Sequence, residues 1–243
     1  MFLFLFLPYG INLAIHLIAA LLPAGILLNY IYKNDTFEKE PRDLIVNLLF
    51  LGVASAFVAI AFEIIGTVVL NISSQIGISS EVYAILTAFF VVAVVEEGAK
   101  FFFLKLRTWK DPNFNYRFDA IVYAACVSLG FAAFENVKYV FSYGLLTAIP
   151  RGFLSIPGHL GFSVIMGYFY GRAKICERNG DESGKNTNLV LSLVCPVLMH
   201  GFYDACLMIG KTWATLVFLV FVVVMYIVIM RLVRRESLTN EPV

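Results

Sequence analysis

Long apolar stretches alternate with short polar breaks along this chain, and the pattern predicts its secondary structure. A helix that crosses a membrane needs about 20 mostly apolar residues. Seven stretches meet this requirement, at residues 10–31, 44–70, 82–105, 118–141, 154–175, 188–210 and 213–232. Turn-forming residues such as Asn34-Asp35 and Asp111-Pro112-Asn113 mark the breaks. The pattern therefore predicts an all-α, polytopic membrane helix bundle of about seven transmembrane helices.

Composition supports this class and excludes a soluble domain. Of the 243 residues, 60% are hydrophobic and 14% are charged, and the charged share is roughly half of that in soluble proteins. The mean hydropathy is +0.83. A net charge of +1 gives no reason to expect nucleic acid as a partner. The four cysteines show no C-x-x-C spacing, so they indicate neither a disulfide framework nor a cysteine-rich zinc site. We expect one integral membrane domain over residues 1–243, with the lipid bilayer as its surroundings.

The positions of Lys and Arg predict how the chain crosses the membrane. The first, third and fifth connections and the C-terminal tail each carry three or more basic residues, whereas the second, fourth and sixth carry one or none. Basic residues are enriched on the cytoplasmic side of membrane proteins. The alternation therefore predicts an outside N-terminus and a cytoplasmic C-terminus, and it supports the number of spans.

Several ionisable side chains lie inside the predicted spans. They are Glu63, Glu96, Glu97, Lys100, Glu135, Lys138, His159, His200 and Asp204. Each would cost about 2.5–3.5 kcal/mol near the bilayer centre if it faced lipid, so these side chains are expected to face one another or a hydrated cavity. Structural ion pairs between helices are the alternative for any single member of the group.

Depth within the spans favours a shared site over isolated ion pairs. With a helical rise of 1.5 Å per residue, the polar groups of spans three to six fall within a slab on the order of 10 Å thick. Glu96 and Lys100 are four residues apart, as are His200 and Asp204, so each pair shares a helix face. Adjacent carboxylates in a low dielectric do not both ionise cheaply. A poised carboxylate close to an imidazole is suited to activating water.

Four motifs allow a comparison with a known family. EEGAK at 96–100, FAAFEN at 131–136, Arg151 ahead of PGH at 157–159, and HGFYD at 200–204 resemble the PrsW family of intramembrane proteases. They are also similar to the wider group that includes the CAAX prenyl endopeptidases. The resemblance covers roughly residues 30 to 210, including YKNDTFEKEPR after span one, and the catalytic core is expected at roughly 82–210. Each motif alone is weak, but four in order on four helices form a specific pattern.

The resemblance implies a glutamate-dependent endopeptidase of the bacterial inner membrane. Its expected substrate is a single-span membrane protein, for example an anti-sigma factor. Glu96 would be the general base, Glu97 would assist it or pair with Lys100, and His159 would complete the water-binding group. His200 and Asp204 would polarise the scissile carbonyl. Glu135 stands where the prenyl endopeptidases have histidine, so its role does not transfer directly. Phe131 and Asn136 flank Glu135 as supporting residues.

The metal requirement stays open at the level of sequence. Two histidines and a glutamate could form a His₂Glu zinc site. However, H-E-x-x-H is absent, and the two histidines come from separate helices. We therefore favour chemistry without a cofactor, with zinc as the alternative.

Other interpretations remain for individual residues and for the whole chain. Glu63 is isolated on span two, and an ion pair with Lys138 or a hydrogen bond explains it better than catalysis. Arg151 either marks an interface or orients the site. A proton-coupled transporter also places Glu, Lys and His at the midplane, although the odd span count and the lack of inverted repeats argue against it. A non-catalytic scaffold related to the proteases would need no water near Glu96.

Overall fold

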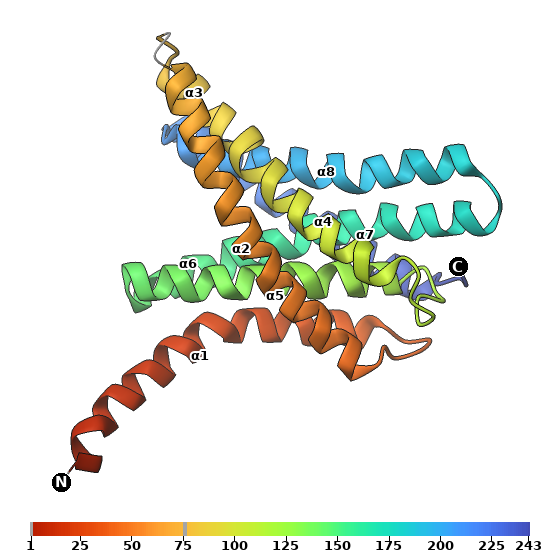
Figure 1. Ribbon diagram of the computed structural model, residues 1–243, viewed down its shortest axis with the longest axis horizontal. Helices are drawn as coiled ribbons and strands as arrows, with labels where there is room; N and C mark the ends of the chain where they lie inside the picture. The colour runs from red at the N-terminus through yellow and green to blue at the C-terminus, as the bar shows by residue number, and fades with distance from the viewer. Residues whose placement is uncertain (1, 75–76) are drawn as a thin grey trace.

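The helices of this protein form a single bundle in the computed structural model, which describes residues 2–74 and 77–243 (Figure 1). The α-helices are α1 (Phe2–Asn34), α2 (Arg42–Ser73), α3 (Ser80–Leu86), α4 (Val94–Thr108), α5 (Asp119–Tyr143), α6 (Ala148–Pro150), α7 (Ile156–Arg178), α8 (Glu182–Ile209) and α9 (Thr212–Leu238). In the described part of the chain, seven helical segments are long and apolar enough to cross a membrane. The predicted all-α class and the seven spans are confirmed. Two of these spans are composite, since α3 continues into α4 and α6 continues into α7.

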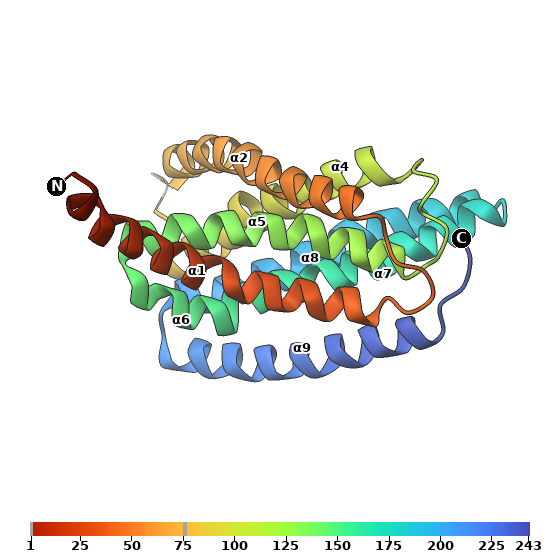
Figure 2. The same ribbon diagram turned by 90° about the horizontal axis from the view of Figure 1, so that it is seen from below.

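Helix α5 occupies the centre of the bundle. Its residues 119–132 are all buried, and α1, α2 and α7 lie against it (Figures 1 and 2). Glycines allow α2 and α5 to cross in backbone contact. A Cβ on Gly130 would lie 2.1 Å from the carbonyl oxygen of Leu49, and a Cβ on Gly52 would lie 2.0 Å from that of Val127. Small residues permit such close helix packing in membranes, and here they fix the crossing of α2 over α5.

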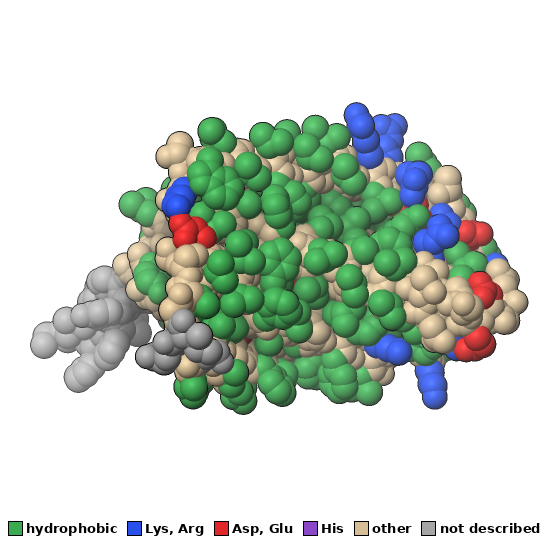
Figure 3. Space-filling view, turned by 90° about the horizontal axis from the view of Figure 1, so that it is seen from above, with side chains coloured by type: hydrophobic (Ala, Val, Ile, Leu, Met, Phe, Trp, Pro, Cys, Tyr) green, Lys and Arg blue, Asp and Glu red, His purple; other side chains and the backbone are tan. Residues whose placement is uncertain are grey.

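The loops predicted to be cytoplasmic lie together at one end of the bundle. The α1–α2, α4–α5 and α7–α8 connections and the C-terminus share the right-hand end of Figure 1. Lys and Arg side chains gather at one end of the face in Figure 3, beside a broad hydrophobic surface. This arrangement agrees with the alternation of basic and non-basic connections. The direction in which the bundle inserts remains a prediction.

Two π-helical turns interrupt the regular helices just before residues of the predicted site. Thr87–Ala93 precedes Glu96, and Arg151–Ser155 precedes His159. Such turns are rare and occur frequently at functional sites. The hydrophobic pattern does not predict either of them, because a one-residue change in the hydrogen-bond register leaves the apolar run intact.

Candidate active site

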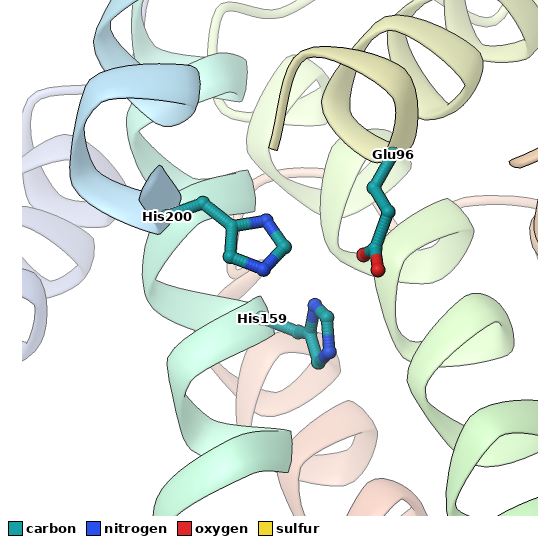
Figure 4. A group of neighbouring side chains, drawn as sticks. All are labelled: Glu96, His159 and His200. Atoms are coloured by element: carbon teal, nitrogen blue, oxygen red, sulfur yellow. The ribbon is translucent and has the colours of Figure 1, made fainter. Parts of the chain in front are cut away.

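Four helices bring the predicted site residues together. The polar cluster consists of Glu96, Glu97 and Lys100 on α4, Glu135 on α5, His159 on α7, and His200 and Asp204 on α8. Except for Glu135 and Asp204, every member is at most 4% exposed. Figure 4 shows Glu96, His159 and His200 pointing toward one another, and each offers a ligand atom within 4.8 Å of the other two. The convergence expected from matched depth is therefore present.

The ammonium group of Lys100 lies at the centre of the polar cluster. Its Nζ is 3.2 Å from Oε2 of Glu96, 2.8 Å from Oε1 of Glu97 and 3.2 Å from Nδ1 of His159. An ammonium has three N–H donors, so each of them has a partner. The Phe131 ring centroid is 4.0 Å from the same nitrogen, a distance that suits a cation–π contact. Phe131 thus packs against Lys100, where a supporting residue was expected.

Carboxylates hold both histidine rings in place. Glu97 Oε1 lies 2.9 Å from Nδ1 of His200, and Glu135 Oε2 lies 3.1 Å from Nε2 of His159. Carboxylate–imidazole contacts fix ring orientation and tautomer. Because Lys100 donates to Nδ1 of His159, the remaining proton of this ring belongs on Nε2, which donates to Glu135.

Hydrogen bonds and an ion pair of Arg151 connect the polar cluster to the start of span five. Arg151 Nε donates to Oδ1 of Asn136 at 3.0 Å, and its terminal nitrogen lies 3.4 Å from Oε2 of Glu135. The Arg151 guanidinium also covers the Tyr139 ring at 3.9 Å. Asn136 is fully buried and donates to the carbonyl of Ala20 on α1 at 2.7 Å. These contacts favour the interpretation in which Arg151 orients the site, and that role stays a proposal.

A cavity of about 440 Å³ opens beside the polar cluster. We call it the site cavity. It is lined by Glu96, Glu135, His159, His200 and Asp204 together with aromatic and aliphatic side chains. Phe162 and Tyr203 belong to this lining, and the Phe162 ring stacks on His200 with 4.8 Å between centroids. The sequence analysis missed both residues. Their spacing could have indicated them, since each follows a site histidine by three residues on the same helix face.

The structure does not form the ion pair expected between Glu63 and Lys138. Both side chains line the site cavity, but among the described residues neither makes a side-chain ion pair. Lys138 Nζ instead lies 5.5 Å from the centroid of the Tyr139 ring. Helix α2 turns Glu63 toward the cavity, while its neighbour Phe62 is 57% exposed on the outer surface. Glu63 is therefore a cavity residue and not half of a structural pair.

The donor set fits a divalent metal such as zinc. Glu96, His159 and His200 are buried and supply one oxygen and two nitrogens at mutual distances that a small shift would bring to zinc coordination. The net charge of the polar cluster is also compatible with a divalent ion. Within the described part of the chain, Lys100 and Arg151 are the only permanently charged side chains that form ion pairs with the four carboxylates of the polar cluster. With neutral imidazoles this leaves two uncompensated negative charges, which a divalent ion or two protons would balance.

Comparisons with known proteins agree on one family. The family described as PrsW family intramembrane metalloprotease matches residues 40–232. Three relatives are named Protease PrsW. That of Oceanobacillus iheyensis is 34% identical, covering 90% of this chain and 94% of its own length. That of Geobacillus kaustophilus is 32% identical over 80% of each chain, and that of Bacillus subtilis is 32% identical over 80% of this chain and 84% of its own. No solved structure matches at a significant level.

Proposed function

Since this chain belongs to the PrsW family of intramembrane metalloproteases, we propose that it cuts single-span membrane proteins, such as an anti-sigma factor, with water activated at Glu96. The family and the seven spans make it an integral bacterial membrane protein and a peptidase of membrane-embedded substrates. The meeting of Glu96, His159 and His200 beside the site cavity carries the finer proposal.

The proposed reaction assigns direct roles to Glu96, His200 and Asp204 at the cavity. Glu96 accepts a proton from water as the water oxygen attacks the scissile carbonyl carbon. His200, with Oδ2 of Asp204 3.4 Å from its Nε2, faces the developing oxyanion and stabilises its charge. Glu96 then returns the proton to the leaving nitrogen as the C–N bond breaks. Water thereby divides between a new carboxyl group and a new amine.

Other residues of the cluster position these groups without touching the substrate. Lys100 holds the Glu96 carboxylate in place, and Glu97 fixes the His200 ring. Glu135 and Arg151 do the same for His159 from the opposite side. Such preorganisation lowers the barrier because the charges need not reorganise during the reaction.

Glu96, His159 and His200 are also the residues that would hold a zinc ion. Zinc bound there would act as a Lewis acid and lower the pKa of a bound water. The family description favours a metal over the metal-free chemistry that the sequence favoured, and the charge deficit is compatible with a divalent ion. Lys100 contacts two of the three donors, so its ammonium and the metal would compete for the same atoms.

A cavity at Glu96 argues against the scaffold alternative. A non-catalytic scaffold would keep its polar groups paired in a dry interior, whereas the Glu96 side chain lines a cavity large enough for several water molecules. Water next to a buried carboxylate is what hydrolysis needs.

The test is cleavage of tagged single-span membrane proteins, anti-sigma factors included, by the purified protein. We expect a fragment with the parent protein and none with Glu96→Gln. Glu182→Gln is the matched control because this carboxylate is 69% exposed on α8, where it pairs with Lys185; it should cut at the parent rate. Equal cleavage by the parent and Glu96→Gln would show that Glu96 is not the base. No cleavage of a broad panel by the parent would contradict the proposed function.

A further inference from the structure

An apolar groove runs along the lipid-facing surface between α1 and α9. It has a volume of about 580 Å³, and its sides include Leu22 and Ile26 on α1 and Ile229 and Met230 on α9. Figure 2 shows α6 between these two helices. The lining carries no charged side chain, and its polar groups are tyrosine hydroxyls. On a helix bundle that spans a membrane, such a groove can take only an apolar occupant.

The floor of this groove is also a wall of the site cavity. We call residues 148–157 the wall segment. Pro150, Arg151 and Leu154 line the site cavity, whereas Ile149 and Phe153 line the groove. One layer of backbone therefore separates the groove from the polar cluster. The two spaces are neighbours on opposite faces of the same segment.

The wall segment lacks the regular hydrogen bonding of a long helix. It starts with a single α-helical turn and continues as a π-helical turn. Pro157 has no N–H to offer the carbonyl of Phe153, four residues earlier. The Tyr226 hydroxyl on α9 donates to this carbonyl instead, at 2.5 Å. A side-chain hydrogen bond from α9 thus replaces a backbone one, and segments with few regular backbone hydrogen bonds open at a lower free energy than regular helices.

We propose that the groove docks the transmembrane helix of the substrate and that the wall segment is the gate through which this helix reaches the site cavity. The inference rests on the proposed function. A transmembrane helix is favoured as occupant because the wall segment alone separates the groove from the site cavity, and a lipid chain has no peptide bond to deliver there. Ala148 and Gly152 line the groove, and small residues allow a helix to approach closely.

Gate movement is tested with a reversible cross-link between the wall segment and α1. A Cβ on Gly152 would lie 3.7 Å from Cβ of Pro23, a separation that suits a disulfide. The variant Pro23→Cys/Gly152→Cys is compared under oxidising and reducing conditions, with each single variant as control. We expect the oxidised double variant to lose cleavage and the reduced one to regain it. Equal rates in both states would overturn the gate.

The same experiment separates failure of the gate from failure of the proposed function. If the reduced double variant and the parent cut no substrate, the proposed function fails. If both cut and oxidation changes nothing, only the gate fails.

The occupant is identified by photo-cross-linking in Glu96→Gln, which is expected to bind the substrate without cutting it. A photoreactive residue replaces Ile149 in the groove, 59% exposed, or Phe62 on α2 as control, 57% exposed. We expect cross-links to the substrate helix from position 149 and none from position 62. Cross-links from 149 to lipid alone, or to a second copy of this chain, would overturn the docking proposal, as would equal substrate cross-links from both positions.

Discussion

Two clusters of buried carboxyl groups differ in the charged side chains that lie next to them. One cluster lies beside the site cavity, and the other lies at the end of the bundle that carries the basic loops. In the polar cluster, Lys100 contacts Glu96 and Glu97, and Arg151 contacts Glu135. The second group, which we call the acidic cluster, consists of Asp35, Glu40 and Asp119, all at most 3% exposed. Among the described residues, no lysine or arginine side chain forms an ion pair with any of these three.

The acidic cluster relies on hydrogen bonds and protons. The Tyr123 hydroxyl donates to Oε2 of Glu40 at 2.7 Å, and in the part of the chain that the structure describes, neither carboxylate oxygen of Asp35 has a hydrogen-bond partner. The Lys39 ammonium group donates its hydrogen bonds to the backbone carbonyls of Tyr32 and Asp35. Burial raises the pKa of Asp35 to about 6 and that of Glu40 to about 8, although Lys39 opposes the first shift and the Tyr123 bond the second.

The comparison shows two ways of keeping carboxyl groups out of water. Fixed cations face the carboxyl groups of the polar cluster and offset part of their charge. Without fixed cations, the acidic cluster binds protons near neutral pH and makes stability depend on pH. The two regions should therefore respond differently to loss of a lysine, to metal and to pH.

Removing the central cation of the polar cluster should have the largest effect. Lys100→Met leaves Glu96 and Glu97 buried without their shared partner. Breaking a buried ion pair from one side costs about 3–5 kcal/mol, so we expect a large fall in the thermal unfolding midpoint in detergent, together with loss of cleavage.

The matched control for this variant is Lys185→Met. Its partner Glu182 is 69% exposed, and exposed pairs contribute about 1 kcal/mol or less. A midpoint change of similar size in the two variants would contradict the view that Lys100 compensates buried charge.

Metal removal should have the second-largest effect, and it should affect the polar cluster but not the acidic cluster. We expect a chelator to abolish cleavage and added zinc to restore it. Glu97→Gln should raise the zinc concentration needed for half restoration by about 10–100-fold, because His200 loses the carboxylate that orients its ring. Asp35→Asn should leave this concentration unchanged. Full cleavage in excess chelator would instead establish metal-free chemistry at Glu96.

Hydropathy predicted the spans well because membrane-crossing length depends on local composition alone. It missed the start of the fifth span, which was expected at residue 154 and begins at Leu145. Gly144, with φ of +92°, ends α5, and the chain re-enters a helix at once. Pro150 and Gly152 make this stretch look like a loop in the sequence, whereas tertiary contacts such as Tyr226 to Phe153 hold it helical.

The sequence predicted the depth of the site residues along their helices, but it did not predict the rotation of each helix about its own axis. Matched positions along the helices placed Glu96, His159 and His200 together, since helical rise is constant. Which face each helix presents depends on packing that a sequence does not show, such as Gly201 against the Phe89 ring, where a Cβ would lie 2.4 Å from the ring. For this reason the bond from Lys100 to His159 and the place of Glu63 in the cavity were not predicted.

The acidic cluster should make stability fall as pH rises. Glu40 has a raised pKa in the folded protein, so the folded state binds its proton more tightly than the unfolded state between about pH 4.5 and pH 8. Glu40→Gln removes this proton uptake while its amide oxygen can still accept from Tyr123. We expect a flatter pH profile of the unfolding midpoint and a higher midpoint near pH 8. An unchanged slope, with Asp35 and Asp119 still present, would show that Glu40 is not the group that binds the proton.

The smallest effect is expected at a loop carboxylate, Asp111, whose pKa shifts the other way. Although its partial burial acts in the opposite direction, hydrogen bonds from Asn113 and Arg107 hold the pKa of Asp111 below its ordinary value. The stability that Asp111 contributes is present above about pH 4 and is lost as the pH falls through its lowered pKa. The Arg107 side chain that pairs with Asp111 is 37% exposed, so solvent screens the pair and Asp111→Asn should cost about 1 kcal/mol or less near neutral pH. The unfolding midpoints of parent and variant should converge in acid, and a variant that is equally destabilised at every pH would show that Asp111 acts through loop geometry instead of charge.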